Sequence, residues 1–204
     1  MRIAMIGTGY VGLVSGTCFA DFGHHVTCVD KDAGKIGALL DGRMPIWEPG
    51  LEGLVKANVQ RGRLAFTTDL AEALKGAEAV FIAVGTPSRR GDGHADLSFV
   101  YAAVEELAGL MTAPVIVVTK STVPVGTGDR IAALLADHGA PDGCCVASNP
   151  EFCARARRSP TSSIPTASWS VPVSKARATC LLKFTGLCSS IARRCCSPAA
   201  APPS

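Results

Sequence analysis

The chain has 204 residues, a formal net charge of +3 and 48% hydrophobic residues, which is enough to build an ordinary apolar core. It contains no run of roughly 18 uninterrupted apolar residues, and the apolar start at Met1–Ile6 is interrupted by glycine. We therefore expect neither a membrane span nor a signal peptide, and we expect a cytoplasmic protein without a membrane partner.

The charge is distributed unevenly along the chain. Residues 154–204 contain eight Lys or Arg and no Asp or Glu, where average usage would place about six acidic residues. The first 153 residues carry 12 basic and 17 acidic side chains. This change predicts a folded domain over 1–152 and a different segment of low order over 153–204.

Short β-branched runs alternate with longer helical patterns in the first part of the chain, which is typical of βαβ units. We expect a strand at Arg2–Ile6, a helix at Tyr10–Phe22, a strand at His25–Val29, a helix at Asp32–Leu40, a helix at Leu51–Val59 and a strand at Leu64–Thr67. Next come a helix from a cap at Asp69 to Lys75, a strand at Ala79–Val84, a helix at Leu97–Met111, a strand at Val115–Thr119, a helix at Gly128–His138 and a strand at Cys145–Ala147. This order predicts one α/β domain with a doubly wound parallel sheet.

Four of the nine cysteines precede residue 153, namely Cys18, Cys28, Cys144 and Cys145. They fall in apolar runs and have no His or Cys at zinc spacing. We expect buried or inert thiols there, and no metal site.

A glycine-rich turn, Gly7-Thr8-Gly9-Tyr10-Val11-Gly12, lies between the first strand and the first helix. Gly7 permits a tight turn, Gly9 lets the backbone approach a pyrophosphate, and Gly12 permits close packing of helix on strand. The helix start then offers free N–H groups to phosphates. The turn predicts a Rossmann-like dinucleotide site.

Asp30 ends the second strand, 18 residues after Gly12. A carboxylate there accepts the ribose hydroxyls of NAD and repels the 2′-phosphate of NADP. The alternative is that Asp30 only caps the next helix. No Arg follows Asp30, so we prefer NAD, although Lys31 and Lys35 leave NADP open.

Three polar segments follow the fourth, fifth and sixth strands, at the sheet edge where open α/β sheets bind ligands. They are Val84-Gly85-Thr86-Pro87, Lys120-Ser121-Thr122-Val123-Pro124-Val125-Gly126-Thr127 and Ser148-Asn149-Pro150-Glu151-Phe152. Any one of them is an ordinary turn by composition. Together they favour a binding site. We expect the long segment over 84–95 to be a binding loop.

These motifs, with Pro45-Ile46-Trp47-Glu48-Pro49-Gly50-Leu51 and Asp96-Leu97-Ser98, resemble the UDP-glucose 6-dehydrogenase family over about residues 1–152. That family oxidises UDP-glucose twice with NAD, through a cysteine-bound intermediate, to UDP-glucuronate. The resemblance implies that Val11, Asp30, Lys35, Thr86 and Thr122 contact NAD. It also implies that Thr122 helps to hold a water near the reacting carbon, and that Glu151 and Phe152 begin the substrate-binding stretch. Intact family members are expected to be homo-oligomers.

The chain departs from the family pattern after Phe152. The family continues Asn-Pro-Glu-Phe-Leu-x-Glu-Gly, whereas this chain continues Cys153-Ala154-Arg155-Ala156, so Arg155 stands in the position of the second glutamate. Residues 163–171 can be encoded so that a one-base shift reads Leu-His-Pro-Asp-Arg-Ile-Val-Val-Gly, which resembles the family's continuation. A shifted reading frame, in the gene or in its sequencing, also explains the Arg, Ala, Ser and Pro bias, so we do not expect nucleic-acid binding.

Three hypotheses about function follow. The first is the NAD-binding part of a UDP-glucose 6-dehydrogenase, whose 204-residue chain is inactive because the nucleophilic cysteine and its partners are missing. The second is a dehydrogenase of GDP-mannose or of a UDP-N-acetyl sugar, since the shared motifs bind NAD and not the sugar. The third is a non-catalytic NAD-binding fragment.

Overall fold

The computed structural model describes residues 1–87, 89 and 95–149. Within them lies a six-stranded parallel sheet in the order β3-β2-β1-β4-β5-β6. The strands are β1 (Arg2–Ile6), β2 (His25–Val29), β3 (Leu64–Thr67), β4 (Ala79–Ile82), β5 (Ile116–Thr119) and β6 (Cys145–Ser148). This is the doubly wound, Rossmann-like α/β fold that the sequence predicts.

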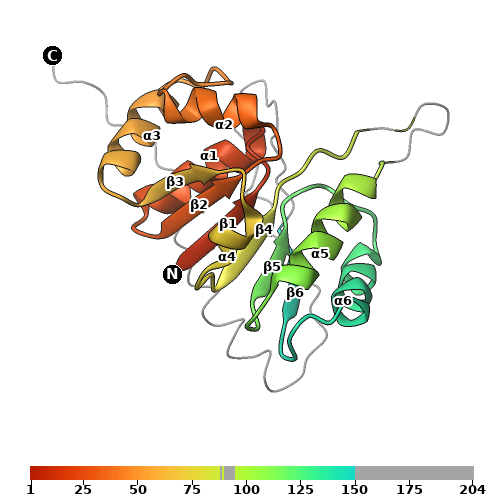
Figure 1. Ribbon diagram of the computed structural model, residues 1–204. Coiled ribbons are helices and arrows are strands. Elements are labelled where there is room, and N and C mark those ends of the chain that lie inside the picture. The colour runs from red at the N-terminus through yellow and green to blue at the C-terminus, as the bar shows by residue number, and fades with distance from the viewer. Residues whose placement is uncertain (88, 90–94, 150–204) are drawn as a thin grey trace, which may run out of the picture. The chain divides into compact units, whose positions relative to one another are not determined.

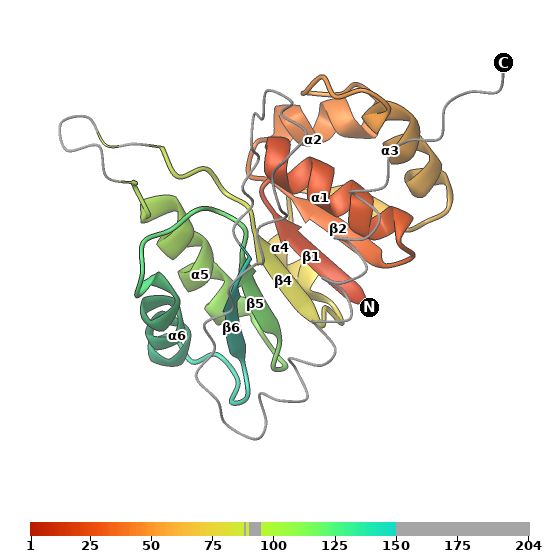
Figure 2. The same cartoon turned by 180° about the vertical axis from the view of Figure 1, so that it is seen from behind.

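Helices cover both faces of the sheet (Figures 1 and 2). They are α1 (Tyr10–Asp21), α2 (Ala33–Leu40), α3 (Leu51–Gln60), α4 (Leu70–Leu74), α5 (Ser98–Leu110) and α6 (Thr127–Asp137). One face carries α4, α5 and α6, whereas α1 packs on the other with α3 beside it. Connections on both faces let a parallel sheet bury its two surfaces.

The central strands are apolar throughout because both of their faces are covered. Every residue of β4 and β5 is buried. On one face Val80, Ile82 and Val117 pack into a core that α5 and α6 complete. On the other face Phe81 packs against Phe19 of α1, with ring centroids 4.8 Å apart. This core fixes the carboxyl ends of β1 and β4, where the candidate site lies.

Most element boundaries agree with the sequence to within a residue, and β4 differs for a physical reason. The expected strand reaches Val84, but β4 ends at Ile82. Beyond it the chain passes the glycine turn so closely that a Cβ on Gly7 would lie 2.8 Å from the Ala83 carbonyl oxygen. The Ala83 N–H still donates to the Ile6 carbonyl oxygen of β1 at 2.8 Å, so the backbone just after Ile82 contacts both the sheet and the glycine turn.

The four described cysteines are free. Cys28 is buried, and burial raises the pKa of its thiol to about 12. Cys18 in α1, Cys144 and Cys145 are half-buried, and Cys145 belongs to the edge strand β6, whose side chains are all partly open. Burial also raises the pKa of Cys144. The expectation of buried or inert thiols thus holds as burial for Cys28, whereas the other three are free and partly open.

Over residues 1–87, 89 and 95–149, no helix combines the length and the apolar character needed to cross a membrane. The expected segment 153–204 lies outside the described residues, as do the middle of the expected loop over 84–95 and the two site residues Glu151 and Phe152.

Candidate functional site

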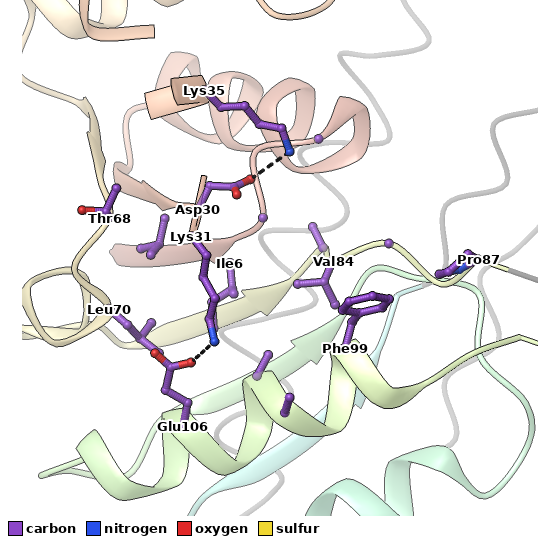
Figure 3. Close-up of a pocket in the computed structure, with 17 residues that line it drawn as sticks. Ile6, Asp30, Lys31, Lys35, Thr68, Leu70, Val84, Pro87, Phe99 and Glu106 are labelled. Atoms are coloured by element: carbon purple, nitrogen blue, oxygen red, sulfur yellow. Dashed lines mark ion pairs between the residues drawn. The ribbon is translucent and has the colours of Figure 1, made fainter. Parts of the chain in front are cut away.

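A pocket of about 570 Å³ opens where the strand order reverses between β1 and β4 (Figure 3). Its volume falls within the range of small-molecule sites, and this point of a doubly wound sheet is where ligands bind. The pocket is lined by Ile6, Gly7, Gly9, Val29, Asp30, Lys31, Lys35, Thr68, Leu70, Ala83, Val84, Gly85, Pro87, Phe99, Ala102, Ala103 and Glu106.

Gly7 and Gly12 close the turn between β1 and α1. Gly7 has φ of 102°, a conformation that L side chains rarely adopt, and its N–H donates to the Val29 carbonyl oxygen at 2.7 Å. A Cβ on Gly12 would lie 1.9 Å from the Gly7 carbonyl oxygen. Helix α1 can therefore begin against the end of β1 only with glycine at position 12.

Gly9 leaves open the space in front of the helix. It is the N-cap of α1 and lines the pocket, and a Cβ built on it meets no atom within 4 Å. The first N–H groups of a helix have no partner within the helix and carry partial positive charge. No acidic side chain occupies the first turn of α1. A cradle with donors and without a competing carboxylate fits the pyrophosphate of a dinucleotide.

Asp30 is held rigidly beside this turn. Its Oδ2 accepts from the Thr8 N–H at 2.8 Å and from Thr8 Oγ1 at 2.7 Å, and its Oδ1 accepts from the Asp32 N–H at 3.0 Å. Burial alone would raise the pKa of this carboxyl, but these hydrogen bonds, with the nearby Lys35 ammonium, outweigh burial and lower the pKa below its ordinary value. Asp30 is therefore an ionised acceptor in the pocket.

The helix cap that was the alternative role for Asp30 is provided by Asp32 instead. Asp32 is the N-cap of α2, and its Oδ1 accepts from the N–H groups of Gly34 and Lys35 at 2.9 and 3.1 Å. A carboxylate offers about four acceptor positions, and the bonds from Thr8 and Asp32 use three at Asp30. The position that remains on Oδ1 is available to a ribose hydroxyl.

Two lysines flank Asp30 in the pocket. Lys35 Nζ lies 3.8 Å from Asp30 Oδ2 and 3.9 Å from Asp32 Oδ2. Lys31 Nζ lies 2.7 Å from Glu106 Oε2 on α5 (Figure 3). Both ammonium groups are thus paired with carboxylates.

An apolar wall faces these charges. It combines side chains from β1, β2, α4 and α5, chiefly Ile6, Val29, Leu70 and Ala103, and all four are buried in the core. A flat aromatic base requires apolar surface of this kind beside a few polar groups. The combination fits the adenosine half of NAD.

The predicted site residues that the structure describes divide into three groups. Gly7, Gly9, Asp30 and Lys35 line the pocket, and Gly12 shapes it from behind. Four others, Tyr10, Val11, Thr86 and Thr122, do not line it. Thr86 lies between the lining residues Gly85 and Pro87, whereas Thr122 is exposed after β5.

Tyr10 points to a different partner. Its hydroxyl donates to Glu48 Oε2 at 2.7 Å, in the loop between α2 and α3. The bond joins the glycine turn to the segment 45–51, which the sequence singles out without giving it a role.

The loops after β4, β5 and β6 are tied together. Ser121 Oγ donates to the Val84 carbonyl oxygen at 2.8 Å, and Lys120 Nζ donates to Asn149 Oδ1 at 3.1 Å. Lys120 is only 6% exposed. The polar segments that the sequence places at one sheet edge are therefore joined there.

Sequence reasoning missed Thr8, Leu70, Phe99 and Glu106. Thr8 could have been found, because it lies between two glycines of the predicted turn, and here its N–H and Oγ1 reach Asp30 just after β2. Glu106 carries no local signal, since it is 75 positions from Lys31 in a helix with polar residues on its outer face.

A model of the UDP-glucose/GDP-mannose dehydrogenase family, NAD binding domain, matches residues 1–158. The chain belongs to this family. Its described residues form a dinucleotide-binding fold, and the glycine cradle and Asp30 fit the NAD that the family's domain binds.

Relatives of known activity match the same part of the chain. The UDP-glucose 6-dehydrogenase of Rhizobium meliloti (strain 1021) is 62% identical over 152 residues, which are 74% of this chain and 35% of that protein. A UDP-glucose 6-dehydrogenase of Bacillus subtilis (strain 168) is 51% identical over 153 residues, with 74% and 34% covered. The chain thus spans about a third of the length of these relatives.

Solved structures share the fold. A ternary complex of GDP-mannose dehydrogenase from Pseudomonas aeruginosa superimposes with a TM-score of 0.70 at 37% identity, covering 74% of this chain and 36% of that chain. A UDP-glucose dehydrogenase from Pyrobaculum islandicum gives 0.69 at 40% identity, with 74% and 35% covered. Enzymes for different nucleotide sugars are therefore similar to this domain.

Proposed function

We propose that the pocket binds NAD, with the adenosine ribose on Asp30 and the pyrophosphate at the start of α1. The observation that carries the proposal is the fixed carboxylate of Asp30 beside an open glycine cradle. Thr8 holds Asp30 before any ligand arrives, so little order is lost on binding. Lys35 neutralises part of the negative charge of the Asp30 carboxylate beside the ribose.

We propose further roles for the residues that lie outside the pocket. Val11 and Thr86 extend the NAD contact along the pyrophosphate and toward the nicotinamide, and Thr122 lies at the reacting end. Thr122 follows Ser121, whose bond to Val84 anchors this loop beside the end of β4. Glu151 and Phe152 begin the substrate-binding stretch and lie outside the described residues.

For the whole protein we propose NAD-dependent oxidation of UDP-glucose to UDP-glucuronate. Bound NAD supplies the hydride acceptor in such a reaction. The higher identities to UDP-glucose 6-dehydrogenases, 62% and 51%, support this sugar. A dehydrogenase of GDP-mannose or a UDP-N-acetyl sugar is the second candidate, because the domain superimposes on a GDP-mannose enzyme equally well.

For the 204-residue chain itself we propose an NAD-binding domain over 1–152 and an aberrant, frame-shifted segment over 153–204. The proposal is supported by the loss of all acidic residues after residue 153 and by Arg155 in the place of the family's glutamate. Without a positioned cysteine and its partners, this chain binds cofactor and does not catalyse.

Titration calorimetry with NAD and NADP tests the binding proposal directly. The chain should bind NAD and should bind NADP more weakly. A version that ends at residue 152 should bind NAD with the same affinity and melt at the same temperature as the 204-residue chain. Preference for NADP would contradict the role of Asp30, and loss of folding in the shorter version would contradict the domain boundary.

A further inference from the structure

A carboxylate on the far side of the pocket holds the ammonium group of Lys31. Lys31 follows β2 and Asp30 directly, whereas Glu106 lies on α5, and Nζ and Oε2 are 2.7 Å apart. Both side chains line the pocket (Figure 3). The lysine therefore extends across the pocket toward α5.

Lys35 is also occupied, on its own side of Asp30. Its Nζ lies within 4 Å of the Asp30 and Asp32 carboxylates. Asp32 is fixed in place as the cap of α2. Lys35 therefore meets two carboxylates, whereas Lys31 is held by Glu106.

A phosphate on the 2′ position of the adenosine ribose would require a cation at this place. It would approach the Asp30 carboxylate, and the like charges would repel each other. Sites that accept NADP overcome the problem with a nearby basic side chain. Lys31 is adjacent to Asp30 and lines the same pocket, so it is a suitable cation if its present partner releases it.

The pairing of Lys31 is weak enough to be exchanged. The side chains of Lys31 and Glu106 are 79% and 40% exposed. Exposed ion pairs are screened by water and contribute little to folding. Loss of the Glu106 charge should therefore leave the fold intact and free the lysine.

We infer that Glu106 is a specificity-determining residue, which strengthens the preference for NAD over NADP by holding Lys31 away from the ribose 2′ position. The inference rests on the proposed binding of the adenosine ribose at Asp30. Asp30 repels a 2′-phosphate directly, and Glu106 withholds the cation that would compensate for that repulsion.

The test compares four variants with the unmodified chain by titration with NAD and with NADP at low ionic strength, where exposed charges are least screened. They are Glu106→Gln, Lys31→Gln, the double variant, and Glu105→Gln as matched control. Glu105 is the neighbouring exposed glutamate of α5, does not line the pocket and loses the same charge. Glu106→Gln should raise the affinity for NADP relative to NAD about fivefold.

The pattern across variants decides the matter. Glu105→Gln should leave the ratio unchanged, and the gain should disappear in the double variant, since it depends on Lys31. The inference would be overturned by any of three results. The affinity for NADP relative to NAD could rise equally in Glu105→Gln, it could still rise in the double variant that lacks Lys31, or it could fail to rise in Glu106→Gln. Failure of the unmodified chain to bind NAD would overturn the proposed function together with it, whereas NAD binding with an unchanged ratio would remove only the role of Glu106.

Discussion

At the scale of single residues, Asp30 joins the glycine turn to the proposed ribose site. Asp30→Ala removes the acceptor for the ribose hydroxyl, so NAD binding should weaken by about 1.5–3 kcal/mol, or roughly 10- to 150-fold. Calorimetry measures the change, and circular dichroism confirms that the variant folds. Glu105→Ala removes one negative charge outside the pocket and serves as control. Equal affinities for the two variants would contradict the assignment.

The Thr8 hydroxyl is one of the groups that lower the pKa of Asp30, together with the N–H groups of Thr8 and Asp32 and the Lys35 ammonium. The lowered pKa means that the carboxylate stabilises the fold fully above its ordinary value of about 3.9 and that this stabilisation is lost as pH falls through the lower, folded value. Thr8→Val removes the Oγ1 bond but keeps the N–H bond, so the pKa of Asp30 should rise toward its ordinary value. The unfolded carboxyl still sets the pH at which this loss begins, so the acid-dependent loss of stability from Asp30 should become smaller and should be complete at a higher pH.

Carbon NMR of the Asp30 carboxyl across a pH series measures this pKa. Thr68→Val, at a threonine that lines the pocket, is the control and should leave the pKa of Asp30 unchanged. A carboxyl that titrates identically in the unmodified chain and in Thr8→Val would show that the hydroxyl bond does not govern its ionisation.

At the scale of elements, the contact of α1 with the end of β1 requires glycine at position 12 for packing, whereas Gly9 leaves space in front of the helix. Gly12→Ala forces a methyl group against the Gly7 carbonyl, 1.9 Å from its oxygen, and should lower the free energy of unfolding by about 1–3 kcal/mol or more. Gly9→Ala meets no atom within 4 Å and should cost at most about 1 kcal/mol as a poorer helix cap.

The effect of Gly9→Ala on NAD binding should be larger than its small effect on the free energy of unfolding suggests. Gly9→Ala projects a methyl group into the cradle and should weaken NAD binding even though the fold is retained. Thermal unfolding and NAD titration of both variants test this. A Gly9→Ala variant that binds NAD normally would show that the pyrophosphate does not approach Gly9.

The elements could be predicted because their signals are local. Ala79–Ile82 and Ile116–Thr119 are continuous apolar runs, as strands buried on both faces must be. Asp32 and Asp69 indicate where helices start, because their side chains accept hydrogen bonds from the first N–H groups of α2 and α4. The pairing of Lys31 with Glu106 could not be predicted, because it depends on how the chain returns to the pocket after β4.

At the scale of the molecule, the described residues account for the proposed cofactor site, whereas the proposed catalysis needs groups that lie outside them. Residues 1–149 provide the pocket, and the relatives are about three times as long as the matched segment. Binding NAD stabilises no transition state at a sugar carbon by itself. Catalysis requires a positioned nucleophile and the groups that activate it.

The 204-residue chain should therefore produce no NADH from UDP-glucose above background, even though it binds NAD. A version in which the reading frame is restored after Phe152 should regain turnover, because the family's continuation then follows Glu151 and Phe152. NADH absorbance measures both proteins with UDP-glucose, GDP-mannose and a UDP-N-acetyl sugar. Turnover by the 204-residue chain would refute its inactivity. Activity of the restored version with only one of the other sugars would assign the enzyme to that sugar, because on the proposed division of roles residues 1–152 bind the cofactor and the choice of sugar lies in the rest of the protein.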